Sequence, residues 1–174
     1  MKFNYPAFKA IYLHEMDRFR RTLMQSLLSP VLSTSLYFIV FGSVIGGYVE
    51  KIDGISYGSY IVPGLLMLTL LTQSITNTSF GIFFPKFNGT IYEILAAPIS
   101  TLEIVLAFVG AGATKTLIVG VVIFITANFF VEVDVKYPLM VVFLLILVAF
   151  TFALFGFLIG LMSSNFEQMS IIPT

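Results

Sequence analysis

The sequence predicts an all-α, polytopic membrane helix bundle with four transmembrane helices, an N-terminal interfacial amphipathic helix and a short cytoplasmic helix. Three observations predict this class. Of the 174 residues, 58% are hydrophobic and only 10% are charged, whereas about 25% of a soluble domain is charged. Charges are absent from stretches long enough to cross a bilayer. Runs such as residues 139–147 are apolar throughout, whereas the strands of a membrane barrel alternate polar and apolar residues.

The charge-free stretches set the positions of the four spans. A bilayer core about 30 Å thick needs roughly 20 helical residues per crossing. Each stretch is long enough for one crossing and too short for two. No charge occurs in residues 22–49, 54–85 and 137–166, and residues 104–131 carry a single charge, Lys115. We therefore expect residues 1–174 to form one membrane domain with spans near residues 26–47, 58–80, 103–129 and 138–162.

The composition excludes several classes of function. The chain has no cysteine and one histidine, His14, so disulfide frameworks, thiolate zinc sites and histidine-based catalysis have no basis. Nine basic residues balance nine acidic ones, so no net field attracts nucleic acid. The glycines before Lys115 do not complete a phosphate-binding loop, because Val109 and Thr114 occupy positions where that motif needs glycine. We expect no enzymatic activity and no cofactor on this chain.

Basic residues predict the orientation in the membrane. Five of them precede the first span and Lys86 follows the second, whereas the loops after the first and third spans carry one each, Lys51 and Lys136. The positive-inside rule therefore puts the N-terminus and the 81–102 loop in the cytoplasm. The segment before the first span is too polar and too long for a signal peptide, so the first span should remain in the mature protein.

Residues 5–24 are typical of an amphipathic helix lying along the inner leaflet. Pro6 predicts where it begins, because proline is tolerated in the first helical turn. The apolar residues share one arc of the helix and most charged residues share the opposite arc. Glu15 lies at the edge of the apolar arc. It either pairs with Arg18, one turn later, or contacts a cytoplasmic partner.

The cytoplasmic segment of residues 88–100 needs a surface to pack on. Capping-box patterns begin at Thr90 and Ser100, and Pro98 separates them, so a short helix of residues 91–97 should end before the proline. This helix is too short to span a bilayer and too apolar to stand free in water. It packs on lipid or on its own bundle, or it docks into a groove on a soluble partner. We favour docking.

A few polar residues lie inside the predicted spans. A lysine near the centre of a span costs roughly 2.5–3.5 kcal/mol, so Lys115 should reach the headgroups, pair with a carboxylate of the bundle, or line a substrate path. Gln73 and Asn77 share a face of the second span, where they either bond to a neighbouring helix or line such a path. Gly156 and Gly160 permit a close approach of two helices.

These features together resemble a known family. A basic amphipathic helix precedes a first span that Ser29 and Pro30 open. The run YIVPGLLM follows at residues 60–67, and the run YEILAAPIS at residues 92–100. In this order, and over its whole length, the sequence resembles the permease subunit of ABC-2 type transporters, and among them the bacterial inner-membrane permeases. The resemblance implies a multi-pass protein of the bacterial inner membrane that exports a drug-like, lipid or polysaccharide substrate.

The resemblance also implies partners and roles. A permease of this family pairs with a second permease, here expected to be a second copy, and with ABC ATP-binding subunits that hold ATP and Mg²⁺. Residues 88–100 would be the coupling segment that docks on the ATPase. The implied docking residues are Tyr92, Glu93, Ile94, Leu95 and Pro98, with support from Glu15 and Arg18. The candidates for the substrate path are Gln73, Asn77 and Lys115.

The family pattern has six spans, whereas this sequence has four and stops where a fifth would begin, so we expect it to be a fragment. Two further classes of function stay open. One is a four-span assembly or scaffold protein that needs no ATPase. The other is an ion-coupled carrier, which the sequence disfavours because every carboxylate is expected in a loop, in a tail or at the end of a span.

Overall fold

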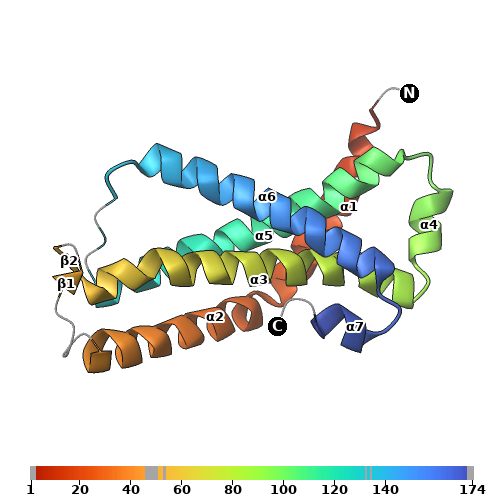
Figure 1. Cartoon of the computed structure of the whole chain (residues 1–174). Coiled ribbons are helices and arrows are strands. Elements are labelled where there is room, and N and C mark those ends of the chain that lie inside the picture. Colours follow the sequence, from red (N-terminus) through yellow and green to blue (C-terminus); the bar gives the residue numbers. More distant parts are fainter. Residues whose placement is uncertain (1–2, 46–50, 53, 132, 134, 172–174) are drawn as a thin grey trace.

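The computed structural model describes residues 3–45, 51–52, 54–131, 133 and 135–171, and most of them are helical (Figure 1). A hairpin of two short antiparallel strands, Lys51–Ile52 and Ile55–Ser56, lies between the first and the second membrane-spanning helix. We call this side of the bundle the hairpin end and the opposite side the α4 end. The elements in chain order are α1 (Tyr5–Arg21), α2 (Leu23–Tyr37), the π-helix η1 (Phe38–Ile45), β1 (Lys51–Ile52), β2 (Ile55–Ser56), α3 (Tyr57–Phe87), α4 (Ile91–Ala96), α5 (Thr101–Phe130), α6 (Pro138–Met162) and α7 (Phe166–Ile171).

The predicted all-α bundle with four spans is confirmed. In the described part of the chain, four helices are long and apolar enough to cross a membrane, namely α2 with the start of η1, α3, α5 and α6. The bounds differ from the expected ones mainly in α3. This helix runs to Phe87 instead of ending near residue 80, so the first part of the predicted 81–102 loop is helical. Residues 46 and 47, the end of the predicted first span, lie outside the described residues.

Close packing of α3 on α6 and α5 forms the centre of the bundle. A Cβ atom on Gly156 of α6 would lie 2.4 Å from the carbonyl oxygen of Ile75, and one on Gly160 would lie 2.6 Å from that of Ser79. The predicted close approach at this glycine pair is therefore confirmed, and it brings α6 onto the backbone of α3. Buried side chains of α3, α5 and α6, including Phe108, form the main hydrophobic cluster beside this contact.

The α4 end is held together by Lys86 and a group of phenylalanines. The Lys86 Nζ donates to the carbonyl oxygens of Leu161 at 2.6 Å and Ser163 at 2.9 Å. These carbonyls lie at the C-terminal end of α6, where a cation is favoured by the helix dipole. In α7, the ring of Phe166 lies 4.9 Å from that of Phe83 in α3. Both contacts attach the last part of the described chain to α3.

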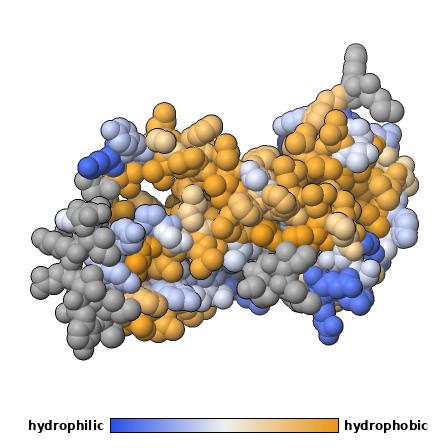
Figure 2. Space-filling view, in the orientation of Figure 1, coloured by the Kyte–Doolittle hydropathy of each residue, from blue (hydrophilic) through white to orange (hydrophobic). Residues whose placement is uncertain are grey.

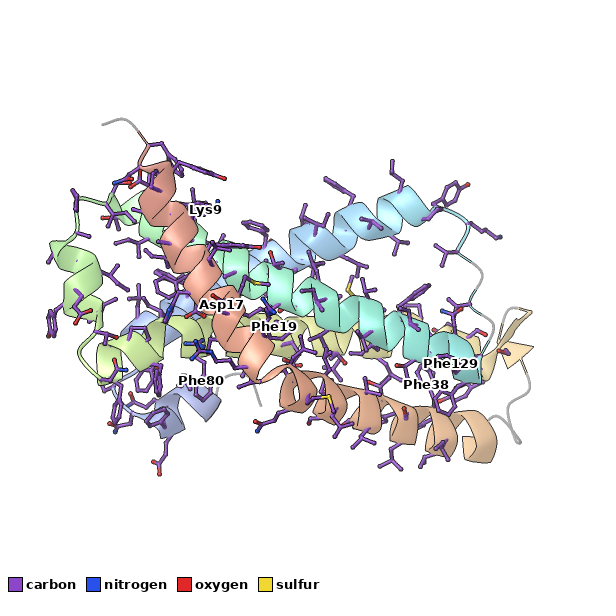
Figure 3. The ribbon with its side chains drawn as sticks, turned by 180° about the vertical axis from the view of Figure 1, so that it is seen from behind. Lys9, Asp17, Phe19, Phe38, Phe80 and Phe129 are labelled. Atoms are coloured by element: carbon purple, nitrogen blue, oxygen red, sulfur yellow. The ribbon has the colours of Figure 1, made fainter. Side chains whose placement is uncertain are left out.

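The structure corrects the expected environment of α1. This helix ends at Arg21, and its contacts are mostly with α5. Figure 3 shows α1 lying across α5. Glu15 and Phe19 are buried and the other residues of the apolar face are half-buried, so this face packs on the bundle. Glu15 consequently lies within the buried face of α1 and not at its edge.

A pair of glycine variants tests the packing of α3 on α6. We expect Gly156→Ala to lower the free energy of unfolding by about 1–3 kcal/mol, because overpacking forces the two backbones apart. Gly64→Ala is the matched control, because no atom lies within 4 Å of a Cβ at this position in α3. It should be neutral or stabilising by up to about 1 kcal/mol. Thermal unfolding in detergent measures both, and equal effects would contradict the predicted close contact.

Candidate functional site

The helix α4 begins without the side-chain cap that the sequence predicts. Thr90 has helical backbone angles (φ −66°, ψ −13°) and makes no side-chain cap bond. Its hydroxyl lies 2.8 Å from Oδ1 of Asn88 and donates to it. An N-cap residue normally has non-helical angles, which turn its side chain back toward the free N–H groups. The predicted capping box of Thr90 and Glu93 is therefore wrong.

The side chains of α4 divide into an inner and an outer set. Ile91 and Ile94 are half-buried and pack against the main hydrophobic cluster. On the outer side, the exposed fraction is 73% for Tyr92 and 62% for Leu95. Glu93 and Pro98 are also exposed. We call the exposed set Tyr92, Glu93, Leu95 and Pro98 the α4 surface. Ile94, which the sequence groups with these residues, instead faces the chain's own core, because α4 has a side turned toward α3 and α5.

The N-terminus of α1 is bonded to the loop that follows α4. The backbone N–H of Asn4 donates to Oε1 of Glu103, and its side-chain Nδ2 donates to the carbonyl oxygen of Pro98 at 3.0 Å. The other carboxylate oxygen of Glu103 accepts the N–H of Ser100 at 2.7 Å, which completes the predicted capping box of α5. Glu103 is 3% exposed. One buried carboxylate thus joins the beginnings of α1 and α5, and we call this contact the Asn4–Glu103 junction.

Further along, α1 and α5 are joined by a buried ion pair. The Lys115 Nζ lies 2.7 Å from Oε2 of Glu15, and Nη2 of Arg18 lies 2.8 Å from the same oxygen. The side chains of Glu15 and Lys115 are 2% and 4% exposed, and that of Arg18 is 33% exposed. Between this Glu15 cluster and the junction, the hydroxyl of Tyr12 donates to Oγ1 of Thr114 at 3.0 Å. The two helices are therefore linked at three levels.

The geometry explains why charged side chains are tolerated here. A buried charge is costly unless it is paired and hydrogen-bonded, and Glu15 neutralises Lys115 while Arg18 retains access to solvent. Gly81 of α3 leaves room for the carboxylate, because a Cβ there would lie 3.3 Å from Oε2 of Glu15. The structure shows the pairing of Lys115 with a carboxylate and also the pairing of Glu15 with Arg18. The sequence treats these as separate possibilities, and only the fold brings them to one oxygen.

Two amide side chains, Gln73 and Asn77, lie one turn apart on α3. The Nδ2 of Asn77 donates to Oε1 of Gln73 at 3.3 Å, and both residues are half-buried. Of the nearby hydroxyls, that of Thr69 donates to the carbonyl oxygen of Leu65 at 2.8 Å, whereas the buried hydroxyls of Ser74 and Thr78 have no hydrogen-bond partner among the described residues. Within the described residues, no hydrogen bond connects Lys115 to either amide. The ammonium group of Lys115 is engaged by Glu15, whereas the two amides bond to each other.

The fold and this site together define a class of protein. A bundle of four membrane-spanning helices presents one short helix at its end, and an N-terminal helix joins the base of that short helix to the bundle. Such an arrangement suits a membrane domain that works with a partner protein, as a transport permease does. Residues 6–174 match the ABC-2 type transporter family, and the chain belongs to this family.

Curated relatives agree with this assignment. The chain is 38% identical over 168 residues to the inner membrane transport permease YadH of Escherichia coli K12, and the same identity holds for the protein of that name in Shigella flexneri. The alignments cover 97% of this chain and 66% of each relative, so the chain spans about two thirds of their length. No solved structure is significantly similar. The chain is a multi-pass protein of the inner membrane.

Variants of the Glu15 cluster should have unequal effects on stability. Glu15→Leu leaves Lys115 buried without its carboxylate, and we expect a loss of about 3–5 kcal/mol in the free energy of unfolding. Lys115→Met should cost less, because Glu15 keeps Arg18. The double variant should recover most of the loss, since apolar side chains of similar volume can replace a buried ion pair. Thermal unfolding in detergent measures these losses. The pairing would be contradicted if the two single variants lost the same free energy of unfolding and the double variant lost the sum of both.

Proposed function

We propose that this chain is part of the membrane-spanning permease subunit of an ATP-driven transporter of the ABC-2 type. In this proposal ATP and Mg²⁺ are held by a separate ABC ATP-binding subunit, and this chain itself is not an enzyme. A second copy of the permease completes the path, and the substrate is a drug-like molecule, a lipid or a polysaccharide that is exported. The observation that carries the proposal is the α4 surface, together with membership of the family.

The α4 surface has the character of a docking site. Tyr92 and Leu95 are large apolar side chains that are mostly exposed on a helix that stands at the end of the bundle (Figure 1). An aromatic anchor next to an aliphatic one is typical of the buried centre of a protein interface. Glu93 adds one negative charge beside these anchors, which favours a partner groove with a basic residue at its rim.

The contacts between α1 and α5 suggest how a displacement of α4 by the docked ATPase would reach the membrane-spanning helices. A displacement of α4 acts directly on Pro98, whose carbonyl oxygen is bonded to Asn4. Because α1 is also bonded to α5 through Glu15 and Lys115, the two helices move together. In this proposal, Glu15 and Arg18 support coupling from inside the bundle and do not contact the ATPase themselves.

We assign the substrate path to the α3 face that carries Gln73 and Asn77. These amides bond to each other, and each retains donor or acceptor capacity for a polar group of a substrate. Lys115 is left out of this assignment because Glu15 engages its ammonium group. The alternatives to this proposal are a four-span scaffold protein that needs no ATPase and an ion-coupled carrier.

Variants of α4 should separate docking from folding. In the transporter reconstituted with its ATPase, we expect Glu93→Lys and Leu95→Ala each to reduce the stimulation of ATP hydrolysis at least fivefold while membrane insertion and melting temperature stay unchanged. Both side chains are exposed, so the fold does not need them. Ile94→Ala is the matched control on the same helix. It should lower the melting temperature, because Ile94 packs in the core.

Co-purification in mild detergent provides the second readout. A cassette ATPase should be retained by the unaltered protein and lost from the Leu95→Ala variant. If no ATPase is retained under several detergents, or if stimulation is unchanged in both α4 surface variants, the proposed function is wrong. Transport that survives ATP depletion but collapses with the proton gradient would instead establish an ion-coupled carrier.

A further inference from the structure

An apolar groove lies between α5 and α6 toward the hairpin end. The N-terminal part of α6 diverges from α3 and α5 (Figure 1). Figure 2 shows a hollow beneath this part of the helix. The volume of the groove is about 420 Å³, within the range of about 300–1,000 Å³ that is typical of ligand pockets. Leu70 and Gly120 lie in its deepest part, and both are buried, whereas Val121 and Val142 form its more exposed walls.

The lining determines what the groove can hold. It consists of leucine, valine, isoleucine, phenylalanine, proline and glycine residues. A cavity without polar partners does not bind ordered water, and a polar ligand would lose its hydrogen bonds there. The groove lies between two helices that can span a membrane, so its natural occupant is hydrocarbon.

Two exposed residues lie next to the lining residues of the groove in the sequence. Val135 and Pro138 both line the groove, and the two residues between them, Lys136 and Tyr137, are exposed. Tyrosine and lysine are the side chains that settle at the boundary between lipid tails and headgroups. A lysine at this position is complementary to the phosphate of a lipid whose tail enters the groove.

We propose that this groove is a binding site for one phospholipid of the leaflet at the hairpin end. One acyl chain lies between α5 and α6 and reaches toward Leu70, and the lipid phosphate pairs with the ammonium group of Lys136. The proposal does not depend on ATP-driven transport. It concerns a lipid held at a defined place, in contrast to the exchanging lipids that cover the outer face of α6.

The size of the groove favours an acyl chain over another helix. A helix with its side chains is about 10 Å wide, much broader than a single acyl chain. A transmembrane helix needs roughly 20 residues, and most of it would lie outside. A single acyl chain is thin enough to enter along the length of the groove.

Photo-crosslinking in vesicles tests the site. The protein is reconstituted in phosphatidylglycerol vesicles that contain a small fraction of phosphatidylglycerol with a diazirine near the end of one acyl chain, and labelled peptides are identified by mass spectrometry. We expect labelling concentrated on the α5 and α6 residues that line the groove. Val121→Trp, which fills the groove, should reduce this labelling at least fivefold. Leu139→Trp is the matched control, because Leu139 is 86% exposed on α6 and does not line the groove.

Two variants test the headgroup contact. Lys136→Gln should reduce the labelling of the groove severalfold, because it removes the charge that pairs with the phosphate, and Lys136→Arg should restore it. Labelling that is uniform over the outer face of α6 and insensitive to Val121→Trp and Lys136→Gln would overturn the proposal. It would show that lipid covers this face without occupying a site.

A cysteine variant keeps the test independent of whether Val121→Trp folds. The chain contains no cysteine, so Val142→Cys places a single thiol on the wall of the groove. We expect a lipid-soluble maleimide to label this thiol more slowly in phosphatidylglycerol vesicles than after delipidation in detergent. Disulfide-linked dimers through this cysteine, or crosslinks from it to another protein segment, would show that protein occupies the groove and would overturn the proposal.

Discussion

The ion pair between Glu15 and Lys115 is the constraint on which the arrangement of this bundle depends. Both charges are buried, and Lys115 in particular would be strongly unfavourable without Glu15. The pair therefore fixes the depth and rotation of α1 against α5, and Gly81 of α3 leaves room for the carboxylate beside it. Because α2 follows α1 after one residue, the position of the first span also follows from this contact.

The two ends of the bundle consequently differ in character. At the α4 end, hydrogen bonds and ion pairs join α1, α5 and the loop after α4, and Lys86 holds the end of α6 against α3. At the hairpin end, the described contacts between helices include apolar ones such as the stacking of Phe38 on Phe130 at 5.8 Å. The polar end is suited to receive force from a partner protein. The groove between α5 and α6 at the hairpin end is suited to contact lipid.

The sequence predicts correctly those features that depend on the thickness of the bilayer or on residues a few positions apart in the chain. Bilayer thickness sets the length of an apolar stretch, so four spans follow from charge spacing alone. The box of Ser100 and Glu103 forms because its partners are three residues apart. The similar pattern at Thr90 fails because the backbone there is already helical, and a pattern of residue types does not specify backbone angles.

By itself, the sequence determined the class of fold, the number of spans and the family. Only the tertiary structure decided which charges meet. Glu15 and Lys115 are separated by 100 positions, and neither periodicity nor hydropathy relates residues at that distance. The same reason applies to Asn4 and Glu103, to the inward turn of Ile94 and to the groove between α5 and α6. Each depends on how helices are placed side by side, which the pattern of one helix does not contain.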